Sequence, residues 1–182
     1  MASTLRPLPG EAVGQKAGRK AQRSLVVFHL ADQAYALPLT EVQEIVPMAK
    51  LSRPPGLPPV LAGFLNLEGT AVPVVRLDRL FQLPEQSLGL YTPLLILRHP
   101  DSQVALLAEK VSEILAVSPE AVLPVPESHS FNDCVEGMIT VQDRVILLLS
   151  AERILLEKEH QCLAEFRDRE QARLAELEEP RP

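Results

Sequence analysis

The chain has 182 residues, of which 46% are hydrophobic and 4% aromatic, and its net charge at pH 7 is −6. This size fits one ordinary domain or two small ones, with a core of Val, Leu and Ile because Trp is absent. The acidic balance argues against broad binding to nucleic-acid phosphates, and no apolar run reaches the roughly 20 residues of a membrane helix.

The first segment, residues 1–22, is basic and contains several Pro and Gly residues, without the apolar stretch of a secretory signal. We expect a disordered leader, and a basic arm that touches acidic lipid or a partner is the alternative. We therefore expect a cytoplasmic protein, in which Cys134 and Cys162 are free thiols rather than a disulfide.

The next segment predicts two hairpins separated by a short helix and a stiff connection. Short apolar runs predict strands at 24–30, 35–37, 64–67 and 70–75. Between the hairpins, Thr40 and Gln43 form a capping pattern that predicts a short helix ending before Pro47. The proline-rich stretch 51–59 should be a surface connection, and 76–81 a single helical turn.

The second half repeats this order. Strands are predicted at 91–98 and 104–108, a short helix at 109–115, a hairpin at 137–149 and a helical turn at 150–155. GMITVQDRVILLL aligns without gaps with GFLNLEGTAVPVV, and Val111 lies 69 positions (111 − 42) after its counterpart Val42. The pattern favours an internal duplication over chance similarity of apolar strands.

Two copies of such a unit would expose strand edges unless each sheet closed on itself. We therefore predict a mainly β fold of two small barrels side by side, with the short helices at their ends. After Glu152 the sequence is rich in helix formers, and its apolar residues recur at roughly helical spacing. This predicts a C-terminal helix and tail over 157–182. The helix either lies across the barrels or binds a partner.

No set of residues in the chain predicts catalysis or metal binding. The four histidines are not at ligand spacing for zinc, and nothing nearby orients His129 as a catalytic base. Asp133 and Glu136 read as solvated loop acids, and no phosphate-binding glycine pattern is present. We expect a protein-binding module that is not an enzyme and has no cofactor or metal.

Four sequence runs carry a resemblance to a known family: LVVFHLADQAYALPLTEVQEI, RPPGLPPVLAGFLNLEGTAVPVV, LLILRHPDSQVALLAEKVSEIL and VEGMITVQDRVILLLSAERIL. In this order, over about residues 23–156, they resemble the CheW family of bacterial chemosensory coupling proteins. The resemblance implies two intertwined, SH3-like, five-stranded barrels, at about 23–88 and 89–156.

The resemblance also implies a non-enzymatic adaptor. Its partners would be the regulatory domain of a CheA-type histidine kinase and the cytoplasmic tips of chemoreceptors, at membrane-associated arrays. The alternative within the family is a competitor or array cap that binds the kinase without coupling it to receptors.

The resemblance assigns roles to particular positions. Those matching kinase contacts are Leu39, Val42, Glu44 and Gly63. Those matching the receptor-facing groove or its neighbourhood are Glu68, Ala105, Val111 and Ile114. For Val42, Val111 and Ile114, plain core packing is the alternative.

Two charges depart from the family pattern. The family turn reads NLRG and is followed by PVVDL, whereas this chain has Glu68 and Arg76 at the charged positions. Glu44 and Glu68 would repel if they lay close together. We interpret Glu68 and Arg76 as a charge swap that tunes partner choice towards an alternative, non-flagellar pathway. Drift on a solvated turn is the alternative.

Overall fold

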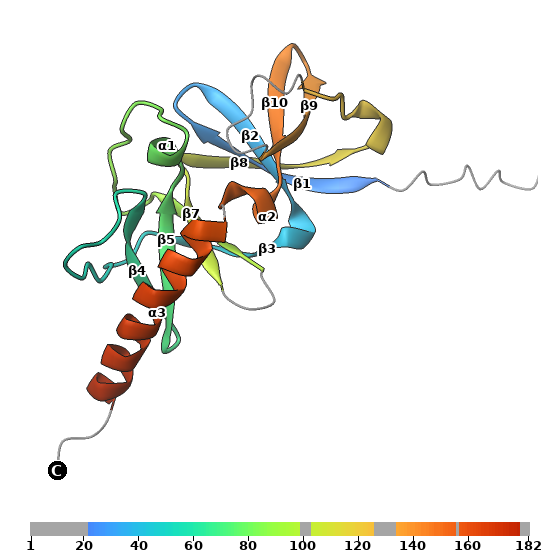
Figure 1. The fold of residues 1–182 in the computed structure, drawn as a ribbon. Helices are drawn as coiled ribbons and strands as arrows, with labels where there is room; N and C mark the ends of the chain where they lie inside the picture. The colour runs from blue at the N-terminus through green and yellow to red at the C-terminus, as the bar shows by residue number, and fades with distance from the viewer. Residues whose placement is uncertain (1–21, 99–102, 126–133, 156, 179–182) are drawn as a thin grey trace, which may run out of the picture.

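The computed structural model describes residues 22–98, 103–125, 134–155 and 157–178 (Figure 1). Its elements come in the order expected of a duplicated unit. The strands are β1 Arg23–Leu30, β2 Gln33–Pro38, β3 Val42–Pro47, β4 Leu61–Leu67, β5 Thr70–Arg76, β6 Pro93–Leu97, β7 Val104–Leu107, β8 Lys110–Val117, β9 Val135–Val141 and β10 Arg144–Leu149. The helices are η1 Leu39–Glu41, α1 Leu77–Leu80, η2 Pro119–Ala121, α2 Ala151–Ile154 and α3 Glu157–Glu178.

The strands form two five-stranded sheets, which we call barrel A (order β8-β1-β2-β10-β9) and barrel B (order β3-β6-β7-β5-β4). Each sheet takes strands from both halves of the sequence, so the two barrels are intertwined. In barrel B, Ser52, in the segment after edge strand β3, forms an isolated bridge with Phe64 of the other edge strand, β4. In barrel A, Leu123, in the segment after edge strand β8, does the same with Met138 of β9. These bridges close the two sheets and leave fewer open backbone groups at their edges.

The pairing register confirms the internal duplication. In barrel B, Val42 is opposite Leu97, and in barrel A its counterpart Val111 is opposite Phe28. The hairpins agree in the same way, because Gly63 is opposite Val74 and Gly137 is opposite Leu148. Each of these strand pairs also has a register irregularity near the same place.

Two predicted short helices are wrong. The chain from Thr40 to Pro47 is a 3-10 turn followed by β3, and residues 109–115 lie mostly in β8. Exposure in β8 alternates from one residue to the next, with a period of two rather than the helical 3.6. β-branched residues in both segments also favour strands, and this signal outweighs the capping pattern at Thr40.

The core has three parts. One apolar cluster fills barrel A, including Leu25 and Val27, and another fills barrel B, including Val74 and Ala105. The largest cluster lies between the barrels and takes the alternate residues of the same strands, such as Phe28 and Leu106. Central strands are therefore buried on both faces, which explains their continuous apolar sequences.

The C-terminal helix α3 runs along β5 and β4 of barrel B, as Figure 1 shows in red beside the green hairpin. Leu163 is buried in the shared core, and Phe166 and Leu174 pack against its edge. The helix therefore lies across its own barrel, as one of the two sequence interpretations expected. The leader, His99, and the segment that holds His129 and Asp133 lie outside the described residues.

Candidate protein-binding surfaces

The first candidate surface, which we call the β3 surface, consists of exposed residues of η1 and β3. Leu39 is 38% exposed and Ile45 is 43% exposed, with Glu44 exposed between them. Val42, in contrast, is only 5% exposed and belongs to the shared core. Of the residues predicted to contact a kinase, Leu39 and Glu44 can therefore meet a partner directly, whereas Val42 supports them from beneath.

Gly63 is the fourth predicted kinase contact, and its role in the fold is to let two segments cross closely. A Cβ atom built there would lie 2.5 Å from the carbonyl oxygen of Ser52 and 2.9 Å from Cβ of Leu51. Its φ of +150° is also one that side chains rarely adopt. Gly63 thus permits the crossing that closes barrel B, and it is buried rather than presented to a partner.

The second candidate surface, which we call the β8 surface, lies on the edge strand β8 and at the start of β10, and an ion pair joins these two strands. Arg144 Nη2 lies 3.0 Å from Glu113 Oε1. The residues that follow these two, Val145 and Ile114, are 45% and 63% exposed. Ile114 was predicted from the sequence, but Val145 and Arg144 were not. The contact of Arg144 with β8 depends on closure of barrel A.

The other predicted receptor contacts are less accessible. Ala105 is fully buried in the centre of barrel B. Val111 is half-buried and packs against the shared core, as its counterpart Val42 does. For Val42 and Val111 the structure therefore favours core packing, while Ile114 remains open to contact.

Glu68 lies at the tip of the β4–β5 hairpin and is exposed. Glu68 and Gly69 have φ values of 50° and 85°, which fits the two-residue turn that matches the twist of a hairpin. Asn66 Oδ1 accepts a hydrogen bond of 2.8 Å from the N–H of Gly69 and helps to fix the turn. Among the described contacts, none joins Glu68 to Glu44, which is in a strand at the other end of the sheet order.

Arg76, the second departure from the family pattern, is not on a solvated turn. It is 6% exposed and donates hydrogen bonds from Nε (3.1 Å) and Nη2 (2.5 Å) to the carboxylate of Asp78. Its guanidinium also reaches Glu85 and the carbonyl oxygen of Gln86. The interpretation of Arg76 as a surface charge is therefore corrected, because this side chain anchors the loop that follows α1.

The charge states of this pair follow from their contacts. Burial by itself would raise the pKa of Asp78, but hydrogen bonds from Arg76 and from the N–H of Gln86, and the charge of Arg76, hold it below its usual value. Hydrogen bonding to Asp78 raises the pKa of Arg76 in turn, against the effect of burial. Both side chains are therefore ionised near neutral pH.

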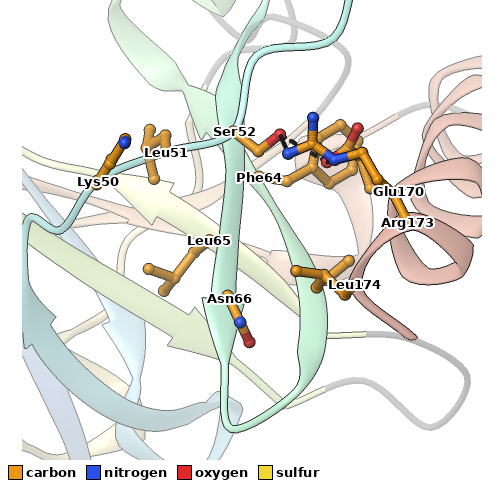
Figure 2. Close-up of a pocket in the computed structure, with 10 residues that line it drawn as sticks. Lys50, Leu51, Ser52, Phe64, Leu65, Asn66, Glu170, Arg173 and Leu174 are labelled. Atoms are coloured by element: carbon orange, nitrogen blue, oxygen red, sulfur yellow. Dashed lines mark hydrogen bonds and ion pairs between the residues drawn. The ribbon is translucent and has the colours of Figure 1, made fainter. Parts of the chain in front are cut away.

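Besides apolar packing, α3 makes several hydrogen bonds to barrel B, and Figure 2 shows those at Ser52 beside a cavity of about 170 Å³. Glu170, only 4% exposed, accepts a hydrogen bond of 2.6 Å from the hydroxyl of Ser52, and Arg173 donates to the same hydroxyl. Gln171 accepts from the N–H of Ala71 and donates to the carbonyl oxygen of Gly69. The helix thereby satisfies open backbone groups of the β4–β5 hairpin.

The described part of the chain offers little for chemistry. Its His, Cys, Asp and Glu residues include no group of three that could hold a metal ion. His29 is half-buried in β1, Cys134 is buried in the shared core, and Glu136 is exposed in β9. None of the helices within the described ranges is long and apolar enough to cross a membrane.

Comparison with known proteins identifies a family. The family model for the CheW-like domain matches residues 24–159. The chemotaxis protein CheW of Helicobacter pylori is 30% identical over 129 residues, covering 70% of this chain and 78% of that protein. The chemotaxis protein CheW of Bacillus subtilis is 25% identical over 138 residues, covering 75% of this chain and 88% of that protein.

A solved structure agrees with these matches at the level of the fold. The crystal structure of the scaffolding protein TtCheW from Thermoanaerobacter tengcongensis matches with a TM-score of 0.68 and 22% identity, over 76% of this chain and 91% of that one. The match supports the SH3-like architecture of the two barrels. With a family model that spans most of the sequence, the chain belongs to the CheW-like family.

Proposed function

We propose that this chain is a non-enzymatic adaptor that joins a CheA-type histidine kinase to the cytoplasmic tips of chemoreceptors. The observation that carries the proposal is family membership together with two exposed surfaces on different barrels. An adaptor needs two separate binding faces, and the intertwined core holds the two barrels rigidly against each other.

The β3 surface, with Leu39 and Glu44, is proposed to bind the regulatory domain of the kinase. The β8 surface, with Ile114 and Val145, is proposed to bind the receptor helices. The exposed apolar side chains of Ile114 and Val145 suit a helix that presents apolar anchors. The less exposed predicted residues would support these surfaces by packing in the core beneath them: Val42, Gly63, Ala105 and Val111.

Isothermal titration calorimetry with the regulatory domain of a kinase encoded beside this chain tests the proposal. Micromolar binding should weaken about tenfold or more in Leu39→Asp, because an apolar contact is replaced by a charge that must be desolvated. Ile114→Asp is the matched control, exposed to a similar or greater extent but on the other surface. Absence of binding by the folded protein, or equal losses in both variants, would contradict the assignment.

We also propose that Glu68 directs the chain to a kinase and receptor of its own, outside the standard flagellar pathway. Its exposed turn allows a charge to be read by a partner, and like charges across an interface suppress the wrong partner. Glu68→Arg should then raise affinity for the kinase domain of a standard flagellar system. Arg76 is left unchanged in this test because an acid there would lie against Asp78 and Glu85. Unchanged affinity for both kinases would sink the idea.

A further inference from the structure

A third surface lies at the end of β3, apart from the residues used so far. The segment after β3 and the loop before β6 border a groove of about 640 Å³. Met48, Leu51 and Leu88 form its floor, where they pack against the core of barrel B. Lys50 and Arg53 line it from the segment after β3 and Leu90 from the loop before β6, and all three are exposed.

The loop that carries Leu90 is firmly held at both ends. At its beginning, the N–H of Gln86 donates to Asp78 at 2.9 Å and its carbonyl oxygen accepts from Arg76 at 3.0 Å. At its end, the hydroxyl of buried Thr92 accepts a hydrogen bond of 2.9 Å from the N–H of Gly89. The carbonyl oxygen of Thr92 accepts another, of 2.8 Å, from the N–H of Met48. The tip of this loop is therefore held in place by hydrogen bonds to the barrel.

Two large hydrophobic side chains project from this anchored tip. Leu90 is 79% exposed and Tyr91 is 93% exposed, the highest values among the large hydrophobic residues in the described ranges. Two neighbouring exposed side chains of this kind mark a candidate protein-binding patch. Because the backbone is already ordered, binding there loses less conformational entropy than binding by a free loop would. An exposed tyrosine on a rigid turn is also a frequent energetic centre of protein interfaces.

The charges decide which partner fits. Among the described residues, Lys50 and Arg53 make no hydrogen bond or ion pair through their side chains, although the chain as a whole carries a net charge of −6. A partner with carboxylates beside an apolar stripe would pair with both cations and cover the floor and Leu90. We propose that this groove, the Leu90 groove, binds an acidic amphipathic helix of a partner protein.

This proposal does not rest on the adaptor function, because it uses neither the β3 surface nor the β8 surface. It is tested on the full chain carrying Tyr91→Trp, which introduces a single tryptophan at a site where a larger ring has room. Two Trp-free peptides of about 18 residues, or five helical turns, serve as probes. They share one leucine stripe and differ only in having Glu or Lys at the polar positions.

The Glu peptide should shift the tryptophan emission to shorter wavelength and protect it from acrylamide quenching. It should bind about tenfold more tightly than the Lys peptide, and added salt should weaken it. Net charge alone would favour the Lys peptide on this acidic chain, so the expected order isolates the local effect of the groove. Equal or tighter binding of the Lys peptide would overturn the proposal.

Variants locate the binding. Lys50→Glu with Arg53→Glu should reverse the order of the two peptides, whereas the matched control Arg98→Glu with Lys110→Glu, also two exposed cations, should preserve it. Leu90→Ser should weaken the Glu peptide about tenfold without changing the fold, because this side chain is exposed. If both double reversals act alike, or if the emission shifts with protein concentration in the absence of peptide, the groove is not a site for an acidic helix.

Discussion

Barrel A and barrel B share one backbone plan but are held together by different chemistry. The end of β5 in barrel B carries the buried pair of Arg76 and Asp78, while the matching positions after β10 hold buried Ser150 and exposed Glu152. In barrel A, the start of the following helix α2 is held by a residue distant in the sequence. Glu41 of η1 accepts a hydrogen bond of 3.1 Å from the N–H of Ala151. After duplication, register was therefore retained while the polar contacts diverged.

The difference matters for the surfaces. The ion pair of barrel B organises the loop that presents Leu90, and α3 covers the adjacent hairpin. Barrel A has neither feature and leaves the Glu113–Arg144 pair and its apolar neighbours open. Two copies of one unit thus present unlike surfaces, which is what joining two different partners requires.

The largest expected effect comes from breaking the buried pair. Asp78→Ala should lower the free energy of unfolding by about 3–5 kcal/mol, since it leaves the buried guanidinium of Arg76 without its main partner. Glu152→Ala, at the matching exposed position, should change it by no more than about 0.5 kcal/mol. Urea denaturation of both variants measures the contrast, and similar losses would show that the two ends are held alike.

The pair of Arg76 and Asp78 also makes the stability of the protein depend on pH in a predictable direction. Because the pKa of Asp78 is held below its usual value of 3.8, its stabilising contribution is present above that value and is lost as pH falls below it. The stability gap between wild type and Asp78→Asn should therefore stay constant from neutral pH down to about pH 5 and shrink in more acidic solution. Denaturant midpoints at several pH values measure it, and a gap that widens on acidification would contradict this account.

Gly63 and Gly137, which lie at matching crossings in the two barrels, allow a finer comparison of stability. Gly63→Ala should destabilise barrel B by about 1–3 kcal/mol, because the new methyl group meets backbone at 2.5 Å and φ is unfavourable. Gly137→Ala should cost less, because its nearest contact, also at 2.5 Å, is a methyl group of Val122 that can move, although Leu123 O lies at 2.8 Å. Thermal unfolding of the two variants measures the losses. A larger loss for Gly137→Ala than for Gly63→Ala would contradict the role given to the backbone contact at Gly63.

A smaller effect is expected where α3 meets barrel B. Gln171→Ala removes two hydrogen bonds to the hairpin backbone and should cost about 1–2 kcal/mol. Hydrogen exchange at Ala71 should become faster, since its N–H loses the side-chain acceptor. Ala172→Ser, at an exposed neighbour on the same helix, is the control. Unchanged exchange at Ala71 in the Gln171 variant would mean that α3 does not protect the hairpin.

The smallest expected effect concerns Glu41, whose pKa is raised above 4.5, mainly by burial and against the hydrogen bond from Ala151. A raised pKa of an acid means that its favourable contribution is present at low pH and is lost as pH rises through the folded value. Glu41→Gln should therefore gain stability relative to wild type between about pH 4 and neutral pH. A relative loss over that range would indicate that the charge itself is needed at Ala151.

The sequence predicted the strands and the duplication well because strands buried on both faces read as unbroken apolar runs. It failed at β3 and β8. At β3 the capping pattern of Thr40 and Gln43 outweighed the β-branched residues. In β8, Val111 and Ile114 are three residues apart, a spacing that a helix also shows. Contacts that depend on barrel closure, such as that of Arg144 with Glu113, leave no local signal. The burial of Arg76 was missed for a related reason. Asp78 is close to it in the sequence, but the sequence does not show that the loop with Glu85 and Gln86 folds over the pair.

The central claim is that one chain binds a kinase and a receptor at the same time through different barrels. The most direct test titrates the kinase regulatory domain into this protein after saturation with a fragment of the receptor tip. We predict that the kinase domain binds with nearly the same affinity as in the absence of the fragment, and that Ile114→Asp abolishes only the receptor step. Mutual exclusion of the two partners would contradict the adaptor account and favour a competitor that binds the kinase alone.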